Sequence, residues 1–181
     1  VPFAMGGIGV FHSVPTSNLG GSALDLTGCL LARIFSRDIT YWSHPDIRAI
    51  NPSLTYSGPI QVVHRVRGSS STAGFTEYLA QKCPASWSLG SGSTITWPTP
   101  GTFEAQGSGG MASFIGSNVG AIGYIDAGHG HSAGLSEIAL QNRDGNYLTT
   151  RTADIGAAGT LALAAGSSVI PSDPSSDFSS V

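Results

Sequence analysis

The residues best suited to chemistry stand together in one short segment of the chain. Arg65 ends an apolar, β-branched run, and residues 68–72 (GSSST) then lead into a pattern typical of a helix. The first turn of a helix has N–H groups without backbone partners and carries partial positive charge, so small residues there allow an oxyanion to approach. A guanidinium nearby adds a planar pair of donors for phosphate or sulfate. The pattern alone has a commoner meaning, which is a serine cap without a ligand.

Hydrophobic periodicity indicates which elements would position this segment. Residues 60–64 (IQVVH) predict a short strand that delivers Arg65 to its end. We call residues 68–72 the serine run. The helix after the serine run would turn Phe75, Tyr78 and Leu79 towards the core, since these residues recur at helical spacing. The segment therefore predicts a strand, an anion-binding loop and a helix N-terminus in direct succession.

The rest of the chain alternates strand and helix patterns, which predicts an α/β fold with a short mixed sheet flanked by helices. The expected strands are one that Pro15 ends, a strand-like stretch at 93–98, a buried strand at 121–126, and a hairpin at 138–150 with its turn at Asp144-Gly145. The expected helices are one with Leu30, Leu31, Ile34 and Phe35 on its inner face and Asp25 or Thr27 as cap, a turn at 46–50, a helix from a Ser108 cap to Ile115, and a partial helix at 153–166. Residues 127–136 predict a Gly-rich loop.

Composition excludes several classes of protein. Only 10% of the 181 residues are charged, against an ordinary share of roughly 25%, and the net charge is −3. Such a balance argues against a nucleic-acid surface or a basic membrane patch. No apolar run approaches the ~20 residues of a membrane span. The Ser- and Gly-rich surface favours a secreted protein, and the start at Val1 without a signal peptide favours a mature or internal fragment.

Other candidate chemistry is weaker. His129 and His131 lie two residues apart without a third metal ligand nearby, which favours a solvated loop over a metal site. His64, beside the candidate site, is more typical of a core histidine with satisfied hydrogen bonds. No G-x-S-x-G elbow or paired carboxylates indicate catalysis, so we expect no enzyme and no cofactor. The three tryptophans are expected in the core: Trp42, Trp87 and Trp97.

The two cysteines, Cys29 and Cys83, match neither a redox pair nor a four-ligand zinc site. Composition leaves two interpretations open, one disulfide or two buried free thiols. We predict the disulfide, because an oxidising compartment favours it and both cysteines stand at expected helix ends.

Several segments together resemble the second lobe of ABC-type phosphate-binding proteins. They follow in that family's order and spacing over nearly the whole chain: VPFAMGGIGVFHSVP, LTGCLLARIFSRDITYWSHPDIRAINPSL, PIQVVHRVRGSSSTAGFTEYLA, GSGSTITWP, QGSGGMASFI and VGAIGYID. The resemblance implies one lobe of a type II periplasmic-binding-protein-like fold. Residues 1–166 would form this lobe, and residues 167–181 would be a Ser/Pro-rich tail or the start of a return to a missing first lobe.

The resemblance also implies roles within the anion-binding segment. Arg65 would grip the anion, and Gly68 would permit its close approach. Ser69 and Ser71 would donate their hydroxyl groups, and Ser70 would donate its backbone N–H.

Two departures from the family pattern concern the same segment, and Thr72 borders the site as a further candidate. Ser70 stands where family members usually carry glycine. Arg67 stands where they carry an acidic residue. An arginine has no acceptor, so we expect Arg67 either to pair with a carboxylate elsewhere or to favour dianions such as sulfate.

Two functions of different classes follow. The first is non-catalytic binding of phosphate or sulfate by an extracellular or periplasmic solute-binding lobe, together with a missing first lobe. The second is a structural or adhesive subunit of an extracellular matrix or fibre, in which the lobe serves as a scaffold and contacts neighbouring subunits. Neither requires nucleic acid, a membrane span or a metal.

Overall fold

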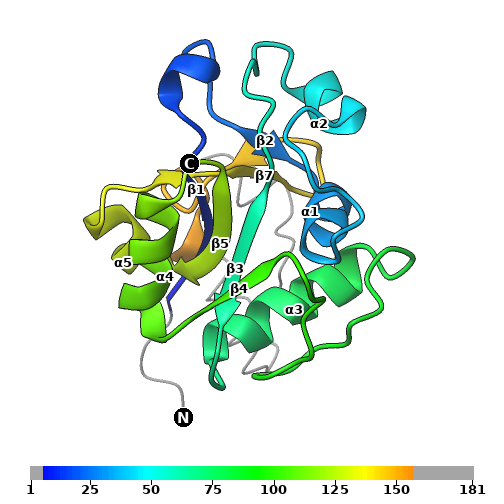
Figure 1. Ribbon diagram of the computed structural model, residues 1–181, viewed down its shortest axis with the longest axis vertical. Helices are drawn as coiled ribbons and strands as arrows, with labels where there is room; N and C mark the ends of the chain where they lie inside the picture. The colour runs from blue at the N-terminus through cyan, green and yellow to red at the C-terminus, as the bar shows by residue number, and fades with distance from the viewer. Residues whose placement is uncertain (1–5, 157–181) are drawn as a thin grey trace.

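A mixed sheet forms the centre of the computed structural model, which describes residues 6–156 (Figure 1). The strand order is β4-β3-β5-β1-β6. The strands are β1 (Ile8–His12), β3 (Gln61–Arg65), β4 (Thr102–Ala105), β5 (Ala121–Asp126) and β6 (Ser136–Glu137). β3 runs parallel to β4 and β5, whereas β1 runs antiparallel to β5 and β6. The carboxyl ends of β3, β4 and β5 therefore meet at one edge of the sheet, and the predicted mixed sheet is confirmed.

A smaller sheet contains the predicted hairpin. Its strands are β2 (Asp25–Leu26), β7 (Ala139–Gln141) and β8 (Tyr147–Leu148). β7 and β8 are antiparallel, and the Asn142 side chain accepts hydrogen bonds from the backbone N–H groups of Asp144 and Asn146. Gly145 adopts a φ of 87°, which glycine reaches without steric cost, so the predicted turn is confirmed.

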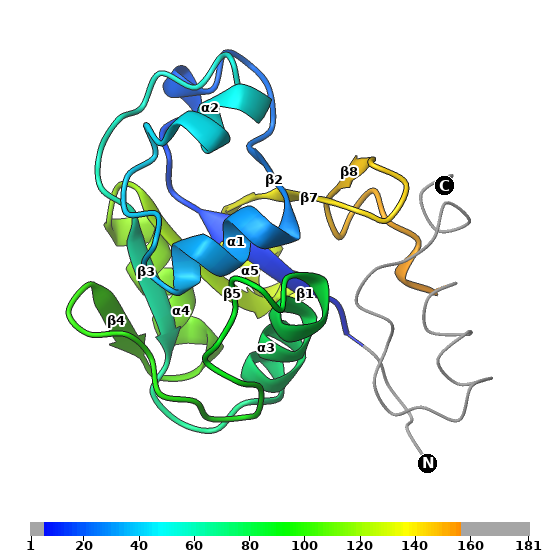
Figure 2. The same ribbon diagram turned by 90° about the vertical axis from the view of Figure 1, so that its right-hand side faces the viewer.

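Helices cover both faces of the central sheet, as Figures 1 and 2 show from two directions. The helices in the described residues are η1 (Thr16–Asn18), α1 (Gly28–Phe35), α2 (Pro45–Ile50), α3 (Ser70–Lys82), α4 (Gly107–Ser117) and α5 (Ala127–Ser132). α1 and α3 lie on one face, and α4 and α5 lie on the opposite face. Neighbouring residues of β3 divide between the two, since Val62 packs in the cluster with α1 and α3, and Val63 packs in the cluster with α4.

The inner faces of α1 and α3 are buried as their periodicity predicts. Thr27, rather than Asp25, caps α1, because its hydroxyl accepts a hydrogen bond from the Leu30 N–H at 3.1 Å. All three tryptophans are buried, which confirms that they belong to the core.

The predicted disulfide is confirmed. Cys29, in the first turn of α1, is bonded to Cys83, the C-cap of α3, and the two Cα atoms lie 5.1 Å apart. The bond closes a loop with a sequence separation of 54 residues. In the chain-entropy account, such a loop stabilises the fold by ~4 kcal/mol at most. The bond joins the end of α3 that lies far from the serine run to the neighbouring helix.

Three local predictions are wrong. Residues 127–132 form α5 rather than part of a Gly-rich loop, because the Asp126 carboxylate accepts a hydrogen bond from the His129 N–H at 3.0 Å and caps the helix. Residues 93–98 form no strand, whereas β4 (Thr102–Ala105) lies outside the expected strands and forms through its pairing with β3. Ser108 lies inside the first turn of α4, whose N-cap is Gln106.

In the described part of the chain, no helix combines the length and apolar character that crossing a membrane requires. The predicted tail at 167–181 and most of the partial helix predicted at 153–166 lie outside the described residues.

Candidate anion-binding site

The predicted segment forms the junction between β3 and α3. Arg65 is the last residue of β3, and Ser69 is the N-cap of α3. The Ser69 hydroxyl oxygen accepts hydrogen bonds from the Ser71 N–H at 3.2 Å and from Arg65 Nη1 at 3.1 Å. One serine therefore holds both the first turn of the helix and the guanidinium. Arg65 Nε is buried and has no hydrogen-bond partner in residues 6–156, so the guanidinium keeps a donor unused.

Two neighbouring segments hold the junction from outside. The Ser69 N–H donates to the Ser93 carbonyl at 3.0 Å, and the Val66 N–H donates to the Ala105 carbonyl at 3.1 Å. Ala105 ends β4, so the loop is attached to the neighbouring strand as well as to the segment around Ser93. These bonds satisfy backbone groups that an exposed loop would otherwise leave to water.

Exposure differs along the serine run. Gly68 and Ser70 are exposed, whereas Ser69 and Ser71 are half-buried. A Cβ atom at Gly68 would lie 3.6 Å from the Ser93 hydroxyl, an ordinary contact, and the φ of Gly68 is not in the left-handed region. The fold itself therefore does not require glycine at this position, and its role in admitting an anion stays a prediction.

Thr72 lies behind the loop. It is 1% exposed, and its hydroxyl oxygen lies 2.8 Å from the hydroxyl oxygen of Tyr124 on β5. Tyr124 also accepts a longer hydrogen bond of 3.4 Å from the Arg65 N–H. The sequence places Tyr124 on a buried strand, but nothing local indicates this contact, because Thr72 and Tyr124 are 52 residues apart.

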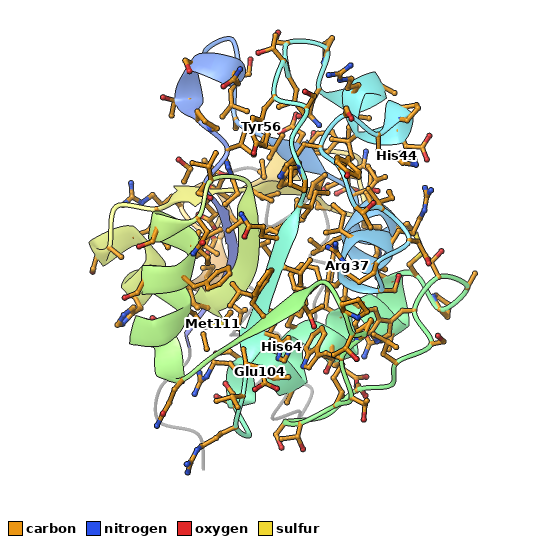
Figure 3. The ribbon with its side chains drawn as sticks, viewed as in Figure 1. Arg37, His44, Tyr56, His64, Glu104 and Met111 are labelled. Carbon is orange, nitrogen blue, oxygen red and sulfur yellow. A yellow bond between two sulfur atoms is a disulfide. The ribbon has the colours of Figure 1, made fainter. Side chains whose placement is uncertain are left out.

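His64 is a core histidine, as expected. It is 4% exposed, its ring stacks on Trp97 at a centroid distance of 4.8 Å, and its Nδ1 lies 3.2 Å from the Arg65 carbonyl oxygen. Burial lowers the pKa of His64 below its ordinary value, against smaller opposing effects of that carbonyl and of Glu104. Figure 3 shows His64 and Glu104 near each other on adjacent strands, in agreement with their pairing. The ring therefore stays neutral near pH 7 and adds no positive charge to the site.

Arg67 is exposed, and no carboxylate within residues 6–156 forms an ion pair with it or with Arg65. The first turn of α3 contains no acidic residue either. Of the two outcomes expected for Arg67, the carboxylate partner is absent from the described part of the chain. The preference for dianions stays a prediction.

The histidines of α5 do not belong to a metal-binding cluster within the described residues. In residues 6–156, no group of three or more His, Cys, Asp and Glu side chains is arranged to hold a metal ion. His131 is half-buried, and its Nε2 lies 3.1 Å from a Glu137 carboxylate oxygen and 3.0 Å from the Thr150 hydroxyl. The expected solvated loop is therefore wrong for His131, whereas His129 is exposed.

A hollow of about 200 Å³ lies between η1, β2 and α2. Leu19, Ile50 and Leu54 supply its apolar lining, and Asp25 and Asn51 also border it. The Asn51 amide is already satisfied by the backbone of Asp25 and by the Ile47 carbonyl. No residue of the serine run lines this hollow, so the candidate site rests on the β3–α3 junction instead.

Comparisons with known proteins agree with this fold. A family described as a PBP superfamily domain matches residues 1–177. The chain belongs to the PBP superfamily. The phosphate-binding protein PstS of Xylella fastidiosa is 35% identical over 164 residues, which cover 89% of this chain and 44% of that protein. PstS of Haemophilus influenzae is 35% identical over 150 residues, which cover 81% of this chain and 43% of that protein. The chain thus spans less than half the length of these relatives.

Solved structures show the same partial correspondence. A high-affinity periplasmic phosphate-binding protein bound with phosphate superposes with a TM-score of 0.65 at 20% identity, over 86% of this chain and 43% of that one. A human phosphate-binding apolipoprotein superposes with a TM-score of 0.63 at 21% identity, over 87% of this chain and 45% of that one. At these identities the likeness concerns the fold, which fits one lobe of such proteins.

Proposed function

We propose that this chain is an oxyanion-binding lobe of a solute-binding protein, with phosphate or sulfate held at the N-terminus of α3. The observation that carries the proposal is the β3–α3 junction, in which Ser69 orients the Arg65 guanidinium while Arg65 Nε is buried and has no hydrogen-bond partner among residues 6–156. The PstS relatives are named as phosphate-binding proteins, which supports phosphate as the first ligand to test.

Each proposed contact uses a donor at this junction. Arg65 supplies charged N–H groups. The Ser69 hydroxyl oxygen accepts two hydrogen bonds and keeps its proton for the anion. Ser70 supplies its N–H as the first residue of the helix, and Ser71 adds its hydroxyl. The exposed Gly68 leaves the approach open.

The same geometry supports binding without catalysis or a cofactor. His64 could act as a base only if its ring faced a hydroxyl of the serine run, but its Nδ1 lies against the Arg65 carbonyl and its ring against Trp97. The donors of this junction are proposed to bind the anion by themselves. A first lobe would add further ligands and raise the affinity, since the chain spans less than half of its relatives. A secreted or periplasmic location agrees with the disulfide.

Calorimetry of the full chain with inorganic phosphate and with sulfate tests this function. We expect a saturable heat with at least one of the two anions that weakens as salt is added, because a charged group carries much of the interaction. Arg143→Ala, which removes an exposed arginine from the β7–β8 turn, is the matched control and should bind like the parent. Absence of binding for both anions would overturn the proposal.

The scaffold function remains the second candidate. It is supported by the low charge of the chain, 10% of residues, and by the exposed Arg67 without a carboxylate partner in the described residues. In that case the junction would retain its geometry, since Ser69 also caps α3, but phosphate and sulfate would not bind. The calorimetry therefore separates the two candidates.

A further inference from the structure

The Tyr124 hydroxyl lies behind the candidate site and contacts both Arg65 and Thr72. Tyr124 is fully buried on β5, the strand next to β3, and its hydroxyl oxygen reaches across to both sides of the β3–α3 junction. On the strand side it accepts a hydrogen bond from the Arg65 N–H at 3.4 Å, and on the helix side it is hydrogen-bonded to the Thr72 hydroxyl oxygen at 2.8 Å. A single phenol thus links the residue that carries the guanidinium to the first turn of α3.

Aromatic side chains pack around the Tyr124 ring and fix the position of its hydroxyl. It stacks on Phe75 of α3 at a centroid distance of 4.4 Å and an interplanar angle of 14°. Trp97 packs on it at 6.1 Å and 24°, and Phe35 of α1 contacts it at 6.1 Å. With neighbours from two helices and a loop, the ring has no room to change its rotamer without disturbing the core.

The hydroxyl has the protonation state that the link requires. Burial raises the pKa of the Tyr124 phenol above its ordinary value, against smaller effects of Thr72 and Arg65. A neutral phenol has one proton to donate and lone pairs to accept with. Accepting from the Arg65 N–H therefore leaves its own proton available for Thr72.

We propose that Tyr124, through Thr72, is a positioning residue that fixes the spacing between the Arg65 guanidinium and the N–H groups at the start of α3. This inference rests on the proposed function, because it assigns a role within the same anion site. Neither side chain touches the anion. Both act by keeping donors from a strand and a helix at one separation, so that the anion does not have to order them on binding.

The test compares variants that remove or keep the two hydroxyl groups. Tyr124→Phe and Thr72→Val each delete one partner while nearly conserving volume, and Thr72→Ser keeps the hydroxyl. We expect Tyr124→Phe and Thr72→Val each to raise the Kd for inorganic phosphate about tenfold, and the double variant to add little beyond either single one, since both break the same link. Thr72→Ser should bind within about twofold of the parent.

A control at a distant tyrosine separates this role from a general loss of stability. Tyr56, at the opposite end of the molecule from His64 in Figure 3, loses its hydroxyl in Tyr56→Phe. Chemical denaturation without phosphate gives the stability of each variant, and calorimetry gives the Kd. We expect Tyr56→Phe to leave the Kd unchanged whatever its effect on stability. If Tyr124→Phe does not fold, the Kd values of Thr72→Val and Thr72→Ser still show whether the hydroxyl link affects phosphate binding.

The outcomes distinguish the two levels of the proposal. If the parent binds phosphate and both Tyr124→Phe and Thr72→Val bind within twofold of it, the positioning role is overturned while the proposed function stands. If Thr72→Ser loses as much affinity as Thr72→Val, the hydroxyl link is overturned in the same way. If the parent binds neither phosphate nor sulfate, the proposed function fails, and the positioning role fails with it.

Discussion

Two strand-to-helix junctions at the same edge of the sheet satisfy their helix N-termini in opposite ways. At the β5–α5 junction, the Asp126 carboxylate accepts a hydrogen bond from the His129 N–H, so the chain supplies its own anion to the helix. At the β3–α3 junction, the cap is the neutral hydroxyl of Ser69, which accepts a hydrogen bond from the Arg65 guanidinium. Both helices follow parallel strands of one sheet.

The difference shows that topology alone does not make an anion site. A helix N-terminus attracts negative charge wherever it occurs, but a carboxylate cap already provides that charge. A serine cap leaves the field of the helix unneutralised. Arg65 increases the positive field, and its buried Nε has no hydrogen-bond partner in the described part of the chain. The four predictions below alter one junction at a time.

The largest effect is expected from Arg65→Ala. The variant removes a charged, two-donor contact worth about 2–3 kcal/mol, which corresponds to roughly 30- to 150-fold in the Kd for phosphate. Calorimetry against the Arg143→Ala control measures the ratio. A Kd within threefold of the control would show that the guanidinium does not contact the anion.

Ser69→Asp gives α3 the kind of cap that α5 has. The carboxylate should still cap the helix, because Asp and Ser are comparably good N-caps, and it should engage Arg65 from the place of the hydroxyl. We expect stability to be maintained and phosphate affinity to fall at least about tenfold, since two anions would then share one site. Ser69→Asn keeps a neutral cap and is the matched control. Equal affinities for the Asp and Asn variants would contradict the comparison.

Asp126→Ala tests the other junction. Loss of the cap should lower the free energy of unfolding by about 1 kcal/mol, whereas Asp126→Asn, which retains a capping oxygen, should lose less. Urea denaturation measures both. Phosphate affinity should not change in either variant, and a change comparable to that of Arg65→Ala would mean that the two junctions are not independent.

Arg67→Asp has the smallest expected effect, because Arg67 is exposed and its charge is screened. The new carboxylate can accept a hydrogen bond from the hydroxyl of protonated phosphate, whereas sulfate has no proton to donate. The ratio of phosphate to sulfate affinity should therefore rise by roughly threefold at low salt. Competition calorimetry at low and high ionic strength checks this. A ratio identical to that of the parent at low salt would exclude Arg67 from the site.

The strongly periodic parts of the fold could be predicted from the sequence. The strand ending in Arg65 and the inner faces of α1 and α3 follow from local patterns, and the cysteines at helix ends pointed to the disulfide. β4 and α5 could not be predicted in the same way. β4 depends on its pairing with β3, about 40 residues away, and α5 contains two glycines among six residues and exists through its cap.

The candidate site also combines residues that the sequence reveals with a contact that only the fold creates. Arg65 and the serine run are contiguous, so their chemistry is visible in the sequence. Tyr124 is not, because its contact with Thr72 exists only once β5 lies beside β3. The sequence left two outcomes open for Arg67 for a related reason, since it shows charges but not their separation in space.

The most direct test of the central claim is a phosphate titration of the isotopically labelled chain, followed through its backbone amide resonances. The account predicts saturable shifts at residues 68–72, where the N-terminus of α3 meets the anion, and no comparable shifts at residues 127–132, where Asp126 already caps α5. Sulfate should produce shifts at the same residues. Shifts centred on α5, or none at residues 68–72 at saturating phosphate and sulfate, would contradict the assignment of the site to the β3–α3 junction.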